Sequence, residues 1–158
     1  MIMNTRKLSG LLIGFSLALT LLVAQQAYAT LGESADSITA DKKALSAVQS
    51  SVRASSKYMI YEIQSKANTV REYVSPSGIV FGIAWNGLTY PDLTLLLGSY
   101  ASEHQKAASN VKRQPGRRFI KIKSDNVVVE KWGHMRNLQG RAYAPSLIPQ
   151  GVNVNEIK

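Results

Sequence analysis

The sequence contains no cysteine, and this absence excludes several kinds of site at once. A chain without a thiol forms no disulfide and has no cysteine nucleophile. It cannot hold zinc, an iron–sulfur cluster or a c-type haem through cysteine, or carry a lipid on an N-terminal cysteine. Packing and hydrogen bonds must therefore stabilise the fold.

Histidine is also scarce, because His104 and His134 are the only two in the chain. A metal site needs several converging histidine or carboxylate ligands, and no acidic residue lies near His134 in the sequence. We expect His104, beside Glu103 at the polar end of a helix, to be solvated. The sequence predicts no metal and no cofactor.

The motifs of common enzyme classes are missing as well. No GxSxG segment is present, and Asn86-Gly87 lacks the second glycine and the lysine of a phosphate-binding loop. Glu62 and Glu72 could face one another across a hairpin as a sugar-hydrolysing pair, or act as ordinary cross-strand ion-pair partners, which we favour. We predict no catalytic residue and no enzymatic activity.

Acidic residues are few relative to basic ones, with 10 Asp and Glu against 19 Lys and Arg. The net charge of +9 favours anionic partners. Six basic residues gather in one stretch, which either contacts phosphates or forms a solvated loop and strand face, the reading that we favour. They are Lys112, Arg113, Arg117, Arg118, Lys121 and Lys123.

The N-terminus has the three parts of a secretory signal peptide. Arg6 and Lys7 precede an apolar run from Leu8 to Ala24, and Ala27-Tyr28-Ala29 offers a cleavage site. We predict a signal peptide over residues 1–29 and one domain over 30–158, with no membrane span after cleavage. An uncleaved anchor is the alternative. We expect export to the periplasm or the cell surface of a Gram-negative bacterium.

Alternating apolar residues predict most of the strands. We expect strands over Tyr58 to Gln64, Thr69 to Ser75, Ile79 to Trp85, Val127 to Trp132, and around Ile120 and Gly140. In the third of these, the small side chains of Val80, Gly82 and Ala84 form a face that a helix could approach closely. We expect Thr30 to Asp36 to be a flexible leader.

Two segments have helical character. After Pro91, an apolar stripe of Leu93, Leu96, Leu97 and Tyr100 predicts the main helix, with Gly98 inside it. Ser37 to Val52 is a weaker candidate. The prediction is an α+β domain, with an antiparallel sheet of five or six strands and the main amphipathic helix packed on one face.

Three segments together resemble an uncharacterised bacterial exported family called Domain of Unknown Function 2844. They are Ala29-Thr30-Leu31-Gly32-Glu33, REYVSPSGIVFGIAWNGLTYPDLTLLLGSY from Arg71 to Tyr100, and GHMRNLQGRAYAPSLIPQG from Gly133 to Gly151. The chain departs from the family pattern at Leu88, where a proline is usual. The resemblance implies an exported single-domain protein and transfers no activity, cofactor or catalytic residue.

Outside these folding signals, His134, Arg136 and Arg141 form the polar group most open to a function. Guanidinium groups bind carboxylate or phosphate through two hydrogen bonds, so these three residues are a candidate anion site. The alternative is that the arginines pair with Glu72 or Asp92 and fix the sheet to the helix.

We therefore expect a non-enzymatic binding or accessory protein of the cell envelope, with a protein or anionic glycan partner. One alternative is a small envelope hydrolase that uses His134 with a carboxylate. Another is an electrostatic binder of extracellular nucleic acid or anionic glycan, although an exported protein rarely meets intracellular nucleic acid. The sequence does not indicate the oligomeric state.

Overall fold

The computed structural model describes residues 30–112, 116 and 118–158, so the predicted signal peptide lies outside the described residues. The helices are α1 (Ile38–Ala44), α2 (Leu93–Leu97) and α3 (Ala101–Ser109). The strands are β1 (Gln49–Ala54), β2 (Met59–Gln64), β3 (Asn68–Val74), β4 (Val80–Gly87), β5 (Ile120–Lys123), β6 (Val128–His134) and β7 (Asn137–Tyr143). No helix in the described part of the chain has both the length and the apolar character needed to span a membrane.

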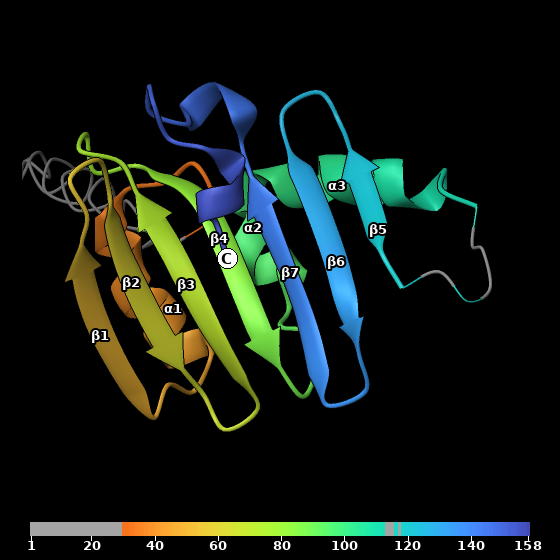
Figure 1. Cartoon of the computed structure of the whole chain (residues 1–158), viewed down its shortest axis with the longest axis horizontal. Helices are drawn as coiled ribbons and strands as arrows, with labels where there is room; N and C mark the ends of the chain where they lie inside the picture. The colour runs from red at the N-terminus through yellow and green to blue at the C-terminus, as the bar shows by residue number, and fades with distance from the viewer. Residues whose placement is uncertain (1–29, 113–115, 117) are drawn as a thin grey trace, which may run out of the picture.

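The seven strands form one antiparallel sheet in the order β1-β2-β3-β4-β7-β6-β5 (Figure 1). This confirms the α+β prediction, but the strand count of five or six was too low. The two edges are formed by β1 and β5. The apolar strand β4 lies in the middle, as its two apolar faces indicated.

The strand missing from the prediction is β1. We expected a weak helix from Ser37 to Val52, but α1 ends at Ala44 and residues 49–54 pair with β2. All six residues of β1 are exposed, so no buried stripe marks them in the sequence. The backbone hydrogen bonds to β2 determine this strand, which is a tertiary effect that local pattern does not report.

All three α-helices cover the same face of the sheet, seen behind the strands in Figure 1. Ile63, Val70, Ile83, Trp85 and Val129 pack there against Leu96 and Leu97. We call this side the helix face.

The start of the domain packs into this layer, so the prediction of a flexible leader was wrong. Leu31 is fully buried, and the amide of Gly32 donates to the Val80 carbonyl at 2.8 Å. Gly98 has φ +48°, and a Cβ there would lie 2.5 Å from Cβ of Thr30. Gly98 therefore ends α2 and gives room to the N-terminal segment, rather than continuing one helix against the sheet.

The opposite face is covered by the C-terminal segment, which we call the tail (Pro145 to Lys158). It crosses in front of β4 and β7 in Figure 1. Ile157 is fully buried, and a Cβ on Gly82 would lie 2.8 Å from its Cδ1. Val80 packs on the helix face, whereas Gly82 and Ala84 face the tail and not a helix, contrary to the sequence prediction. We call this side the tail face.

Candidate functional site

The structure places the three predicted anion-site residues along one hairpin without bringing them together. His134 ends β6, Arg136 lies in the turn with φ +67°, and Arg141 is in the body of β7, opposite Glu130. The Nδ1 atom of His134 contacts the carbonyl of Met135 at 3.0 Å. Both His134 and Arg136 are exposed, so any anion site here stays a prediction.

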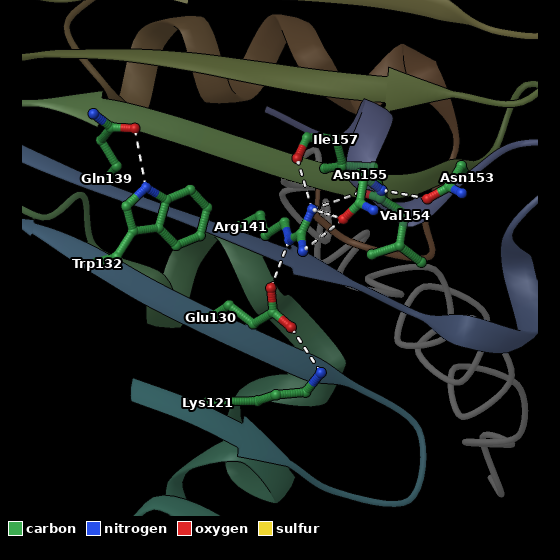
Figure 2. A network of polar contacts seen from close by, with 9 residues as sticks. All are labelled: Lys121, Glu130, Trp132, Gln139, Arg141, Asn153, Val154, Asn155 and Ile157. Carbon is green, nitrogen blue, oxygen red and sulfur yellow. Dashed lines mark hydrogen bonds and ion pairs between the residues drawn. The ribbon is translucent and has the colours of Figure 1, made fainter. Parts of the chain in front are cut away.

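Arg141 instead ties the tail to the sheet (Figure 2). Its Nε donates to Glu130 Oε2 at 2.6 Å, and its Nη1 donates to the carbonyls of Val154 at 2.8 Å and Ile157 at 3.4 Å. Both terminal nitrogens also reach the Asn155 side chain. The guanidinium is thus occupied by partners within the chain. The alternative of a structural ion pair fits Arg141, although its acid is Glu130 and not Glu72 or Asp92.

Glu130 is the acid at the centre of this network. Its side chain is only 4% exposed, and it also accepts from Lys121 Nζ at 2.8 Å. Burial acts to raise the pKa of Glu130, but the hydrogen bonds and charges of Lys121 and Arg141 outweigh it and lower the pKa below its ordinary value. The carboxylate is therefore held ionised between two cations.

A second ion pair lies on the same face nearer β1. Arg71 Nε donates to Glu62 Oε2 at 2.8 Å, directly across β2 and β3. Tyr73 hydrogen-bonds through its hydroxyl to the Lys158 carbonyl at 2.7 Å and so also holds the tail. Glu62 therefore has the cross-strand role that we favoured.

Glu72 lies on the other face, because it is next to Arg71 in β3 and its side chain points the opposite way. It is fully buried under α1, beside Asp41. Burial, and secondly Asp41, raise the pKa of Glu72 well above its ordinary value. Glu62 and Glu72 therefore do not form a carboxylate pair around a substrate.

The basic stretch forms the loop before β5 and the edge strand itself. Of its six residues, Arg113 and Arg117 lie outside the described part of the chain. Lys121 is paired with Glu130, whereas Lys112, Arg118 and Lys123 are exposed and make no ion pair with any described residue. Three exposed cations, two in the segment before β5 and one in β5 itself, are thus without an ion-pair partner among the described residues.

Two acids besides Glu130 lie near this edge, and neither makes an ion pair with a described cation. Glu103 of α3 accepts hydrogen bonds from the amide and the side chain of Asn126, at 2.8 and 3.2 Å. Asp125 lies in the turn between β5 and β6. Phe119 is 44% exposed beside these cations. The edge at β5 combines unpaired strand backbone, positive charge and one exposed aromatic ring.

One residue pair escaped the sequence analysis. His104, expected to be solvated, is half-buried and lines a hollow together with Lys131. Neither residue belongs to a motif, and the only signal in the sequence was a lysine in the apolar alternation of β6. Within the described ranges, no three histidine or acidic residues gather closely enough to hold a metal ion.

Residues 27–157 match the model of a family described as "Protein of unknown function (DUF2844)", and the chain belongs to this family. This confirms the resemblance seen in the sequence. A search of curated proteins gave no match.

Among solved structures, the fold is similar to the crystal structure of a cysteine-rich secretory protein from Staphylococcus aureus. The identity is 12% and the TM-score 0.44, over 74% of this chain and 45% of that one. The chain thus spans less than half of that protein's length, and the likeness carries no functional argument.

Proposed function

We propose that the protein is an exported, non-catalytic binding protein of the bacterial cell envelope, and that the basic edge at β5 holds an anionic glycan. The observation that carries this proposal is the set of unpaired cations at Lys112, Arg118 and Lys123. Export is supported by the layout of residues 1–29, which has the three parts of a signal peptide.

The chemistry of this edge suits a chain of repeated negative charges. Exposed lysine and arginine side chains bind such polymers through long-range attraction, which added salt screens over about 10 Å at 0.1 M. A second strand of a protein partner could pair with β5, but the charges do not require one. An acidic polysaccharide offers repeated carboxylates that can contact both the cations before β5 and Lys123 in the strand.

The arrangement around His134 does not support the alternative of a hydrolase. It needed His134 beside a carboxylate, but His134 contacts a backbone carbonyl, and no described acid is within ion-pair distance of it. A binding role therefore fits the arrangement better.

Binding of a fluorescent polyuronate, followed by anisotropy at several salt concentrations, tests the proposal. Charge reversal in Arg118→Glu/Lys123→Glu should weaken binding roughly tenfold or more and flatten its salt dependence. The matched control Lys43→Glu/Lys66→Glu changes the net charge equally, at exposed positions in the last turn of α1 and in the β2–β3 turn. Equal losses in both double variants, or no binding by the unmodified protein, would reject the proposal. Preference for DNA over polyuronate would replace the glycan with nucleic acid.

A further inference from the structure

A hollow of about 520 Å³ lies on the helix face, between the α2–α3 segment and β6. Leu93, Leu97, Ala101 and Ala108 give it an apolar side, and His104 and Lys131 give it a basic side. The volume falls within the range of about 300–1,000 Å³ that is typical of small-molecule sites.

Lys131 stands out in its row of the sheet. Across the strands it lies between Ile120 and Gly140, and the row continues through Trp85 to Val70. Lys131 is the only charged residue in this run, which otherwise forms part of the apolar floor under the helices. Folding alone would favour an aliphatic side chain at this position, because the partial burial of an ammonium group costs free energy.

No described acid pairs with this ammonium. Its Nζ lies over the ring of Tyr90, 5.4 Å from the ring centroid. The two acids on the neighbouring helices point elsewhere: Asp92 accepts from the Thr94 amide at 2.8 Å, and Glu103 binds Asn126. The hollow therefore contains a cation without a counter-ion from the described residues.

His104 is a second basic side chain in the hollow whose charged form is disfavoured there. Burial, and secondly the charge of Lys131, lower the pKa of His104. Burial also lowers the pKa of Lys131 itself. An anion placed between these two side chains would reverse both penalties, since it favours the charged form of each group.

We propose that this hollow, called the groove from here on, binds a single-chain amphiphile with a carboxylate head group, such as a free fatty acid. The carboxylate lies beside Lys131 and His104, and the hydrocarbon chain follows Leu93, Leu97, Ala101 and Ala108. Charge complementarity selects the head group, and the apolar side of the groove selects the chain. This site is separate from the edge at β5, so it goes beyond the proposed glycan binding.

Isothermal titration of the purified protein with dodecanoate tests this site. Lys131→Met keeps the length of the side chain and removes its charge, so it should weaken dodecanoate binding at least tenfold, which is about 1.4 kcal/mol. Lys123→Met is the matched control, because Lys123 lies in the neighbouring strand outside the groove, and it should leave dodecanoate affinity unchanged. Dodecanol, which has no charge, should bind the unmodified protein and Lys131→Met equally.

Three results would overturn the proposal. These are the absence of dodecanoate binding, equal dodecanoate affinity in the unmodified protein and Lys131→Met, or equal loss in both lysine variants. Circular dichroism of each variant shows whether it is folded. Lys131-dependent binding to anionic phospholipid vesicles, without binding of free dodecanoate, would reject a single-chain ligand and assign the groove to a membrane lipid. If Lys123→Met loses polyuronate binding and Lys131→Met does not, the glycan site and the fatty-acid site are independent of one another.

Discussion

Arg141 and Lys131 are basic residues on neighbouring strands, but they have opposite surroundings. Arg141 points to the tail face and is 16% exposed, with Glu130 and two carbonyls of the tail as acceptors. Lys131 points to the helix face, where it meets an aromatic ring and the hollow lined by His104. One cation is surrounded by acceptors, and the other has space beside it.

This difference indicates which basic residue is available for a ligand. The partners of Arg141 are the segments that close the tail face, so its loss should affect the fold. Lys131 joins no such network and contributes little to holding elements together. Its half-buried position is easier to explain by a ligand than by folding. The structural role of Arg141 and the proposed ligand-binding role of Lys131 are distinguished by how many acceptors surround each side chain, and not by whether the residue is an arginine or a lysine.

The largest expected effect is on the tail face. Glu130→Gln should lower the free energy of unfolding by about 3–5 kcal/mol, because it leaves Arg141 buried without its counter-charge. Urea denaturation followed by tryptophan fluorescence measures the change. Glu62→Gln is the control: that carboxylate is 19% exposed beside Arg71, so we expect a loss of no more than about 1 kcal/mol. Similar losses in the two variants would show that burial does not distinguish these ion pairs.

A smaller effect is expected from Gly140, which lies between Trp85 and Lys131 on the helix face. A Cβ there would overlap the Trp85 ring and approach the Glu130 carbonyl at 2.6 Å. Gly140→Ala should therefore destabilise the protein by about 1–3 kcal/mol. Gly82→Ala should cost less, since the closest atom to its Cβ would be the terminal Cδ1 of Ile157, at 2.8 Å. Thermal unfolding of both variants checks the order, and the reverse order would contradict the packing described for the two faces.

The smallest expected effect depends on pH and concerns Glu72, an acidic residue of β3 that is buried on the helix face. Its raised pKa means that the folded state holds a proton that the unfolded chain releases above about pH 4.5. The stability contributed by Glu72 is therefore present at lower pH and is lost as pH rises from that value through the raised pKa. Glu72→Gln keeps the size of the side chain but cannot ionise, so it should flatten this dependence.

Melting temperatures at pH 5 and pH 8 measure this effect. We expect Glu72→Gln to gain relative to the unmodified protein at pH 8, with little difference at pH 5. An equal loss at both values would show that the carboxyl pair is not protonated in the folded protein.

Much of the sheet could be predicted from the sequence, because β2, β3, β4 and β6 are rich in apolar and β-branched residues and each buries part of them. The exposed strand β1 could not, since its position depends on pairing with β2. The tail could not be placed either. Both faces of β4 are apolar, so the pattern did not tell which face the helices cover and which one Gly82 offers to Ile157.

The candidate sites also divide into features that the local sequence shows and features that depend on tertiary packing. The sequence located the basic stretch around β5, because six cations lie close together in the chain. It also selected Arg141 from the neighbouring glycine and arginine residues, but partners from the tail, 13 to 16 residues further on, occupy that side chain. His104 and Lys131 are 27 residues apart, and only the packing of α3 near β6 brings them to one hollow.

The most direct test of this account is a matched pair of substitutions, Arg141→Met and Lys131→Met, compared by urea denaturation in one buffer. Each replaces a long cationic side chain with an uncharged one of similar length, on neighbouring strands. We expect Arg141→Met to lose about 3–5 kcal/mol, because Glu130 keeps a buried charge with only Lys121 as its partner. Lys131→Met should stay within about 1 kcal/mol of the unmodified protein, since it loses one cation–π contact and a desolvation penalty together. Equal losses in the two variants would contradict the account, because Lys131 would then support the fold as Arg141 does.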